Sequence, residues 1–342
     1  MQSIRIHEHG GPDNLIYEEV KEPAIGPGDV LVEVKACSLN HLDIWVRSGS
    51  TGADYGLPRI PGSDISGIVS EVGSEVESVK SGEEVILYPA YYCGTCETCL
   101  VGRQTFCDSY APLGTITDGG DAEYISVPER NVMPKPEILD FNEAAAFPLV
   151  FLTAWHMLVS LGEVKEGDKV LVHAAGSGVG MAAIQIARHF CARVYTTSST
   201  DEKLEKAKEI GADVVINYEK EDFQDVIYKD SDGEGVDLVI EHVGPATWSD
   251  SIRSLKKGGR LVTCGATTGP VAEIELRRIF SRQISIFGSY MGYLSELFDV
   301  LRYINSGALK PIVDSTFMLK DAAEAHKHME SRKQFGKIIL NP

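Results

Sequence analysis

The chain has 342 residues, 43% hydrophobic and 24% charged, which is an ordinary globular composition with enough length for two packed domains. Its 32 Lys and Arg against 50 Asp and Glu give a net charge of −18, which repels a phosphate backbone and makes nucleic acid a poor candidate partner. The N-terminus, MQSIRIHEHG, lacks a basic region followed by an apolar run, and polar residues interrupt the most apolar stretch, residues 144–159. We therefore expect a soluble protein without a signal peptide or a membrane span.

The first part of the chain, residues 28–127, is predicted to form an irregular β-barrel-like domain. Short β-rich runs such as DVLVEVKA, ISGIVSEVG and EEVILY alternate there with Gly and Pro. We expect few helices in this part.

Four of the seven cysteines lie within residues 93–107 at a spacing typical of a metal site: Cys93, Cys96, Cys99 and Cys107. Such thiolates can wrap a tetrahedral zinc ion at Zn–S distances of about 2.3 Å. Because sulfur would fill all four positions, this zinc should stabilise its loop and do no chemistry. Two disulfides or four free thiols are the alternatives, but the clustering favours a metal in a reducing cytoplasm.

After residue 141 the pattern changes to strands that alternate with helices. The strand KVLVH, residues 169–173, precedes a Gly-rich turn, a helix over residues 181–190 and a strand over residues 193–197. The alternation continues through VVINY, VDLVIEHVG, GRLVTCG and QISIFGS. Six strands with helical crossovers predict an α/β domain, a doubly wound parallel sheet with Rossmann topology.

The turn after the first of these strands, HAAGSGVG, is predicted to bind the pyrophosphate of a dinucleotide. Small residues there let backbone N–H groups at a helix N-terminus approach the phosphates. Ala175 and Ser177 break a strict GxGxxG, so a simple tight turn is the alternative, but the surrounding βαβ pattern favours the cofactor. The candidate binding residues are Gly176, Ser177, Gly178, Val179 and Gly180.

The end of the second strand favours NADPH over NADH. The run YTTSST, which includes Ser198, has no Asp or Glu to bond a ribose 2′-OH and repel a 2′-phosphate. Lys203 and Tyr218 are candidates to offer a cation and a hydroxyl to that phosphate. Alternatively, Lys203 is a solvated helix residue and Tyr218 a half-buried strand end.

Together, the four-cysteine lobe, AAGSGVG, HVG, CGATTG and the terminal FGKIIL resemble the medium-chain dehydrogenase/reductase superfamily over essentially the whole chain. The resemblance implies a GroES-like catalytic domain, residues 1–140 and 291–342, and a Rossmann cofactor domain, residues 141–290. It also implies homodimers or homotetramers joined through the cofactor domains. Further candidate cofactor contacts are Thr153, Val243, Gly265 and Phe287.

Zinc alcohol dehydrogenases of that superfamily hold a catalytic zinc, and this sequence departs from them at each ligand. The matching positions are Asn40, Ser63 and Leu149, whose amide, hydroxyl and alkyl groups cannot form a usual zinc shell. The alternative is a rearranged site, which could draw on Cys37, His41, Asp43 or Asp64. A chain that keeps the structural zinc site and lacks the catalytic one resembles the quinone oxidoreductase-like members of the superfamily.

The resulting hypothesis is a metal-free hydride transfer from NADPH to a quinone or to an alkene conjugated to a carbonyl, as in an enone, enal or enoyl thioester. Such a reduction needs a positioned hydride donor, a hydrogen bond to the oxygen and a proton source. Asn40 is the candidate to polarise the carbonyl or hold the nicotinamide, and His41 and Asp43 are candidate proton carriers. Two other functions stay open: a zinc-dependent alcohol or aldehyde dehydrogenase with a rearranged site, and a non-catalytic protein that binds NADPH or a partner.

Overall fold

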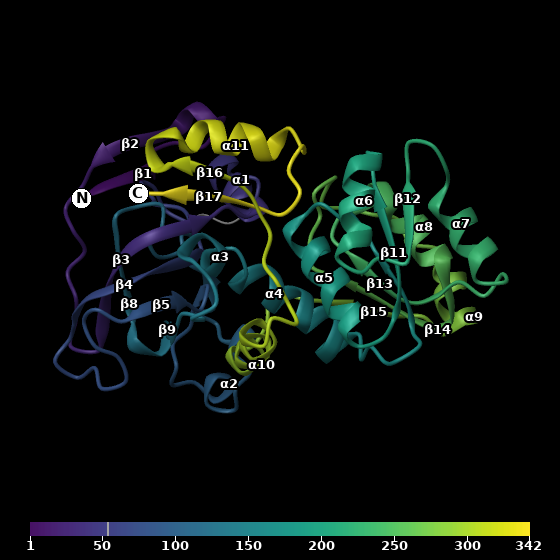
Figure 1. Ribbon diagram of the computed structural model, residues 1–342, viewed down its shortest axis with the longest axis horizontal. Coiled ribbons are helices and arrows are strands. Elements are labelled where there is room, and N and C mark those ends of the chain that lie inside the picture. Colours follow the sequence, from purple (N-terminus) through teal and green to yellow (C-terminus); the bar gives the residue numbers. More distant parts are fainter. Residues whose placement is uncertain (53–54) are drawn as a thin grey trace. The chain divides into compact units, whose positions relative to one another are not determined.

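The structure of the protein is a computed structural model that describes residues 1–52 and 55–342 (Figure 1). The chain divides into two compact units. One contains residues 1–149 and 297–342, and the other contains residues 150–296. Among the described residues, no helix is long and apolar enough to cross a membrane.

The divisions fall nine and six residues later than the expected 140/141 and 290/291. Helix α3 (Phe141–Ala145) packs against strands of the first unit, where Ala145 is buried with Ala36 and Ile339. Glu296 is hydrogen-bonded to His156 of the second unit, so the chain leaves that unit only after it. Both boundaries are thus set by buried contacts that local sequence patterns do not report.

The first unit is built around a mixed sheet of seven strands within residues 1–52, 55–149 and 297–342. Its order is β16-β17-β3-β4-β5-β9, and β8 also pairs with β3. The alternating Val30, Val32 and Val34 of β3 face the core, as the two-residue period of a strand requires. The strands are β3 (Asp29–Ser38), β4 (Asp64–Val72), β5 (Glu84–Leu87), β8 (Tyr124–Pro128), β9 (Val132–Pro134), β16 (Val313–Met318) and β17 (Lys337–Asn341).

The last strand of the chain joins this sheet, because β17 pairs antiparallel with β3. Two short antiparallel pairs lie outside this sheet: β1 (Gln2–Ile6) with β2 (Leu15–Glu19), and β6 (Ala90–Tyr91) with β7 (Ala111–Pro112). The helices that begin in or belong to this unit are short: α1 (His41–Ser48), α2 (Glu97–Leu100), α4 (Pro148–Trp155) and α11 (Ala322–Glu330). The expected GroES-like, β-rich domain is confirmed.

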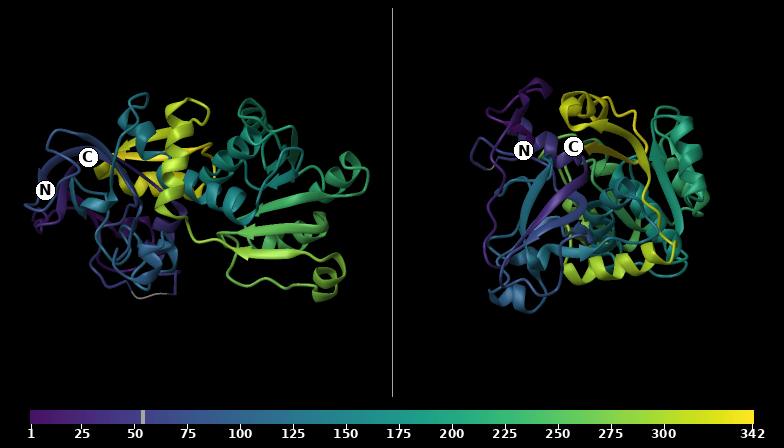
Figure 2. Two further views of the ribbon diagram at one scale, coloured as in Figure 1. Left: turned by 90° about the horizontal axis from the view of Figure 1, so that it is seen from below. Right: turned by 60° about the vertical axis from the view of Figure 1, so that its left-hand side comes forward.

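The second unit, all of whose residues are described, is a six-stranded parallel sheet with helical crossovers, as the sequence predicts (Figure 2). The strand order is β12-β11-β10-β13-β14-β15, so the order reverses between β10 and β13. The strands are β10 (Lys169–Val172), β11 (Arg193–Ser198), β12 (Val214–Asn217), β13 (Val236–Glu241), β14 (Leu255–Thr263) and β15 (Ser285–Gly288). The helices are α5 (Gly178–His189), α6 (Asp201–Glu209), α7 (Phe223–Asp230), α8 (Pro245–Ser254) and α9 (Leu276–Arg282), and α10 (Leu294–Asn305) spans the second boundary.

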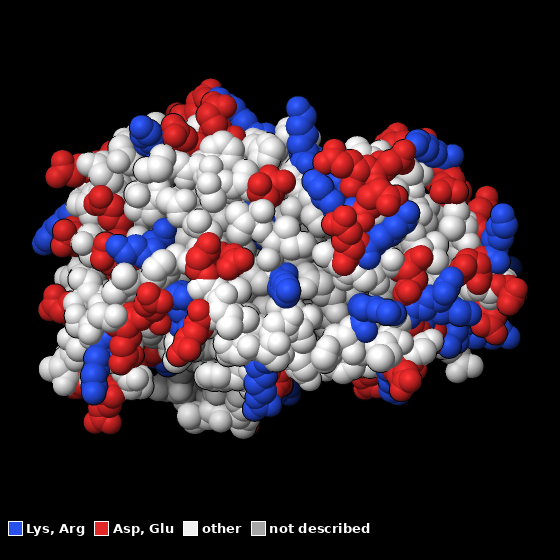
Figure 3. All heavy atoms as spheres, viewed as in Figure 1, with Lys and Arg blue, Asp and Glu red and all other residues white. Residues whose placement is uncertain are grey.

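Acidic and basic side chains are mixed on the face that Figure 3 presents, where acidic atoms outnumber basic ones. This distribution agrees with the net charge of −18. It offers no broad basic surface on that face for a phosphate backbone.

Candidate functional site

A buried hydrogen-bonded network in the first unit joins Asn40, Asp64 and Lys337. The Lys337 ammonium donates to Asn40 Oδ1 at 2.6 Å and to Asp64 Oδ2 at 3.0 Å. Asn40 Nδ2 also donates to Asp64 Oδ2 at 3.0 Å. The three residues are at most 6% exposed. A cation so deeply buried is tolerated because a carboxylate and an amide oxygen satisfy it.

The three positions expected to match zinc ligands, Asn40, Ser63 and Leu149, all bond to other groups of the protein. The second N–H of the Asn40 amide points at Ser38 O, 3.4 Å away, so both of its amide hydrogens have partners within the protein. The buried Ser63 hydroxyl donates to Leu113 O at 2.7 Å, and Leu149 N donates to Asp64 Oδ1 at 2.7 Å. The Asn40 amide is therefore held in place and has no unengaged donor for a carbonyl.

Two further carboxyl groups, Asp43 and Asp121, are buried in the same unit. Asp43 caps helix α1, because its Oδ2 accepts the Asn40 backbone N–H at 2.7 Å. Burial and the charge of Asp121 raise the pKa of Asp43 to about 7. Burial likewise raises the pKa of Asp121 to about 6, and neither of its buried carboxyl oxygens has a hydrogen-bond partner among the described residues. This pair of acids therefore titrates near neutral pH.

The two candidate proton carriers lie in different surroundings. His41 begins helix α1 and is exposed, with its ring edge-on to Trp45 at a centroid distance of 4.9 Å. Asp43 is 2% exposed and acts as a helix cap. Of the two, His41 has access to solvent protons.

The four cysteines of the lobe fit a closed zinc shell. Their Sγ atoms all lie within 4.8 Å of one another, and the Cys93 and Cys99 sulfurs are 3.9 Å apart. A tetrahedral ion with Zn–S distances of about 2.3 Å needs sulfurs about 3.8 Å apart. The backbone N–H groups of Thr95 and Cys96 point at Cys93 Sγ, which favours a thiolate. Among the described residues, no other group of three or more His, Cys, Asp or Glu meets this geometry.

The disulfide alternative is wrong for this structure, because all seven cysteines of the chain, each within the described residues, are free. Helix α2 carries Cys99, and the 3-10 turn Gln104–Phe106 leads directly into Cys107. These two short helices present the thiols toward one point.

The predicted cofactor turn lies at the carboxyl end of β10. Helix α5 begins at Gly178, three residues before the expected start, because the Ser177 hydroxyl caps it by accepting the Gly180 N–H at 2.9 Å. A Cβ atom on Gly180 would lie 2.3 Å from Ala174 O, so only glycine fits there. The turn therefore combines a free helix N-terminus with close packing of helix on strand, the arrangement that a pyrophosphate needs.

The remaining candidate cofactor residues lie along the same edge of the sheet or on helices. Ser198 ends β11, Tyr218 follows β12, and Val243 and Gly265 follow β13 and β14. Phe287 is the penultimate residue of β15, Thr153 is buried in α4 and Lys203 lies in α6. The carboxyl edge of a doubly wound sheet is where dinucleotides bind.

The run YTTSST at the end of β11 contains no carboxylate side chain, and Ser198 there is buried. The first acid after the strand, Asp201, is engaged by Asn217 Nδ2 at 2.7 Å and by the Lys220 ammonium. Tyr218, whose backbone N–H donates to Ser198 O at 3.2 Å, is 49% exposed. The acidic charge nearest this strand end is thus neutralised within the protein.

Sequence reasoning missed three buried ionisable residues: His173, Glu241 and Lys337. Each ends or begins an apolar strand run, at KVLVH, VDLVIE and KIILN, and a charge in such a run is a signal for a buried partner. The partners themselves lie 68 to 297 positions away, as His173 with Glu241 and Lys337 with Asn40 show. Only the fold reveals those pairings.

Comparisons with known proteins agree with this architecture. The chain matches the family described as "Alcohol dehydrogenase GroES-like domain" over residues 26–137 and "Zinc-binding dehydrogenase" over residues 178–306. It is 31% identical to the quinone oxidoreductase of Rattus norvegicus, covering 99% of this chain and 97% of that one. It is 33% identical to a 2-haloacrylate reductase of a Burkholderia species, covering 98% of each. A solved NAD-dependent alcohol dehydrogenase is 43% identical, with a TM-score of 0.97 and full coverage of both chains.

The chain therefore belongs to the medium-chain dehydrogenase/reductase superfamily, in its quinone oxidoreductase-like branch, and is an oxidoreductase.

Proposed function

We propose that the protein transfers a hydride from NADPH to a quinone or to an alkene conjugated to a carbonyl, without a catalytic metal. The observation that carries the proposal is the set Asn40, Ser63 and Leu149, an amide, a hydroxyl and an alkyl side chain, at the family's zinc-ligand positions. The amide and the hydroxyl are already bound to protein groups. Alcohol oxidation depends on removal of a hydroxyl proton, which a Lewis acid eases, whereas reduction of an activated alkene does not.

The relatives support this substrate class. One is a quinone oxidoreductase, and a 2-haloacrylate reductase acts, by its name, on an alkene beside a carboxyl group. Both classes of substrate are electron-poor and accept hydride without loss of a hydroxyl proton.

The residues at the carboxyl edge of the second unit fit a nicotinamide dinucleotide. The N-terminus of α5, with Gly176–Gly180, would hold the pyrophosphate. Ser198, Lys203 and Tyr218 would hold a 2′-phosphate, because β11 ends without a carboxylate. When bound, the nicotinamide supplies the hydride. The nicotinamide half would contact the other candidates: Thr153, Val243, Gly265 and Phe287.

We further propose that one zinc ion, held by the four cysteines, stabilises the lobe of residues 93–107. The support is the closed set of four sulfurs at zinc-compatible spacing. His41 is the proposed proton carrier, because it is exposed while Asp43 is buried as a helix cap. Asn40 holds the network with Asp64 and Lys337 in place.

The test is consumption of NADPH, followed by its absorbance, with a quinone, an enone, an enal and an enoyl thioester beside a primary alcohol with NADP⁺. The proposal predicts turnover of at least one electron-poor acceptor and none of the alcohol. Turnover of the alcohol alone would contradict it. NADH in place of NADPH tests the cofactor preference in the same assay.

One observation favours a second candidate, an NAD-dependent alcohol dehydrogenase, because a solved enzyme of that name is 43% identical over the full chain. This candidate needs a rearranged catalytic metal site, and a second zinc ion per chain would support it.

We also propose that the protein is a homo-oligomer, a dimer or tetramer joined through the second unit. β15 is an edge strand of its sheet, and neighbouring Val271, Leu276 and Phe280 are at least 68% exposed. A Phe280→Ser variant should shift the mass measured by light scattering toward that of one chain. Val226→Ser, at a partly buried position of the same unit, is the control for a loss of stability without a change at the proposed interface.

A further inference from the structure

A buried pair of titratable residues lies where the strand order of the second unit reverses. His173 directly follows β10, and Glu241 is the last residue of β13, the strand beside it. The two residues are 1% and 0% exposed, and His173 Nε2 lies 3.7 Å from Glu241 Oε2. This reversal point is where the two halves of a doubly wound sheet meet under a bound dinucleotide.

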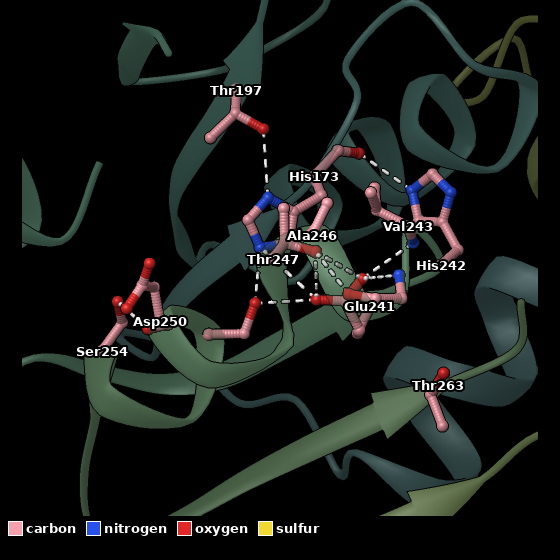
Figure 4. Close-up of polar contacts among 12 residues, drawn as sticks. His173, Thr197, Glu241, His242, Val243, Ala246, Thr247, Asp250, Ser254 and Thr263 are labelled. Atoms are coloured by element: carbon pink, nitrogen blue, oxygen red, sulfur yellow. Dashed lines mark hydrogen bonds and ion pairs between the residues drawn. The ribbon is translucent and has the colours of Figure 1, made fainter. Parts of the chain in front are cut away.

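Glu241 anchors the turn between β13 and α8 (Figure 4). Its Oε1 accepts the backbone N–H of Val243 at 2.7 Å and of Gly244 at 3.1 Å. The Thr247 hydroxyl donates to both of its oxygens, at 3.1 and 2.9 Å. Gly244 is the N-cap residue of α8 and has no side chain, and the Ala246 N–H of the first helical turn donates to Thr268 Oγ1 at 3.2 Å. Glu241 therefore fixes the turn that leads into the helix rather than the helix end itself.

A directed chain of hydrogen bonds connects Glu241 to the turn after β10. Because an ionised carboxylate only accepts, the Ser251 hydroxyl donates to Glu241 Oε2 at 2.7 Å, and His173 Nε2 must donate to Ser251 Oγ at 2.8 Å. His173 Nδ1 then accepts from the Thr197 hydroxyl at 3.1 Å, which in turn accepts the Ala174 N–H. Burial lowers the pKa of His173, which keeps the imidazole neutral, as this chain requires.

The same network reaches the loops after β13 and β14. His242 Nε2 lies 2.9 Å from His173 O, a contact within the turn region at the ends of β10 and β13. Val243 O accepts the Thr268 N–H at 2.9 Å and the Thr268 hydroxyl at 2.7 Å. The loops after β10, β13 and β14 and the end of β11 are thus tied to one buried centre.

We propose that Glu241 and His173 are positioning residues for the dinucleotide, which hold the Val243–Gly244 turn at a fixed place relative to the pyrophosphate turn that starts at Ala174. The inference rests on the proposed binding of NADPH at this edge. The first half of the sheet, β10 to β12, takes the adenosine side of a dinucleotide and the second half takes the nicotinamide side. The Glu241 turn belongs to the second half. Removing a hydrogen bond of the network should therefore weaken binding of the nicotinamide half and leave binding of the phosphoadenosine half unchanged.

The test compares two serines of helix α8 in the full-length protein. Ser251→Ala removes the hydroxyl that links Glu241 to His173. Ser254→Ala is the matched control, because Ser254 is equally buried one turn later and its hydroxyl donates to Asp250 O at 2.8 Å, away from Glu241 and His173 (Figure 4). The dissociation constants of NADPH and of adenosine 2′,5′-bisphosphate, which lacks the nicotinamide half, are measured by calorimetry.

We expect Ser251→Ala to weaken NADPH binding about tenfold, equivalent to about 1.4 kcal/mol, with adenosine 2′,5′-bisphosphate within twofold of the native protein. Ser254→Ala should change neither. Equal losses for the two ligands, or equal effects of the two substitutions, would overturn the inference. If the native protein binds neither NADPH nor NADH, the proposed function itself fails, which is a separate result.

A second pair of variants keeps the test informative if Ser251→Ala folds poorly. Thr247→Val removes the hydroxyl that bonds Glu241 at nearly constant volume, and Thr247→Ser retains it. We expect Thr247→Val to raise the dissociation constant of NADPH but not that of adenosine 2′,5′-bisphosphate. Thr247→Ser should keep the dissociation constant of NADPH within twofold of the native value. Failure of Ser to restore binding would contradict a role for the hydrogen bond.

Discussion

The two units each bury a network of charged side chains, and the networks balance their charges differently. In the first unit the buried cation Lys337 faces Asp64, while the buried Asp43 and Asp121 have pKa values raised to about 7 and about 6. In the second unit burial raises the pKa of Glu241, but the hydrogen bonds that its two oxygens accept from Ser251, Gly244 and Val243 help to hold that pKa below its ordinary value.

This difference in charge balance determines how the stability of each network changes with pH. The first carries more carboxyl groups than it can pair, so protonation relieves it. The second is satisfied with Glu241 ionised and His173 neutral, so protonation of His173 disrupts it. The two networks therefore depend on pH in opposite directions.

The largest expected effect comes from removing the buried cation. Lys337→Met leaves the Asp64 carboxylate buried without its ion-pair partner, which should lower the free energy of unfolding by about 3–5 kcal/mol. Amide hydrogen exchange of β3 and β4 measures this loss. Lys135→Met is the control, since Lys135 is as buried but pairs with the half-exposed Glu84; an equal loss in both variants would contradict the special role of Lys337.

The next effect concerns the acids of the first unit. The native pKa of Asp121, about 6, lies above its ordinary 3.8, so its contribution to stability is full below pH 3.8 and is lost as pH rises through 6. That loss is at most about 3 kcal/mol, from 1.36 kcal/mol per pKa unit. Asp121→Asn should flatten the pH dependence of exchange in β3 and β4 between pH 4 and 7.5. An unchanged slope would show that Asp121 does not titrate in this range.

The second unit should show the reverse slope, with a smaller amplitude. The native pKa of His173 is lowered below 6.5, so its contribution is full above pH 6.5 and is lost as pH falls. His173→Gln should destabilise β10 and β13 by about 1–2 kcal/mol at pH 7.5 and remove their weakening toward pH 5.5. Nitrogen NMR of the imidazole adds a direct check, because a native His173 protonated at pH 6.5 would contradict the neutral form.

The smallest effect tests cofactor selectivity at the end of β11. Lys203→Ala should raise the dissociation constant of NADPH about tenfold through loss of a charge-assisted hydrogen bond, with NADH within twofold. Lys206→Ala, one turn along the same helix, is the control, because Lys206 is not among the residues proposed to hold the 2′-phosphate. Equal weakening of NADPH and NADH by Lys203→Ala would remove this residue from the 2′-phosphate site.

Features written in local spacing could be predicted from the sequence, and features made by distant contacts could not. The four thiols of the lobe, the six parallel strands and the turn after β10 each depend on neighbouring residues. The orientation of the Asn40 amide depends on Lys337, 297 positions later, and the Glu241 turn depends on His173 of another strand. The boundaries between the two units also lie later in the chain than the sequence predicts, because α3 packs on the first unit and Glu296 bonds to His156.

The number of zinc ions per purified chain directly tests whether the protein transfers a hydride without a catalytic metal. The measurement is made by mass spectrometry on the native protein and on a Cys93→Ser/Cys96→Ser variant that removes the lobe site. The account predicts one zinc in the native chain and none in the variant. Two zinc ions in the native chain, with one retained in the variant, would contradict the metal-free mechanism and make alcohols the first substrates to test.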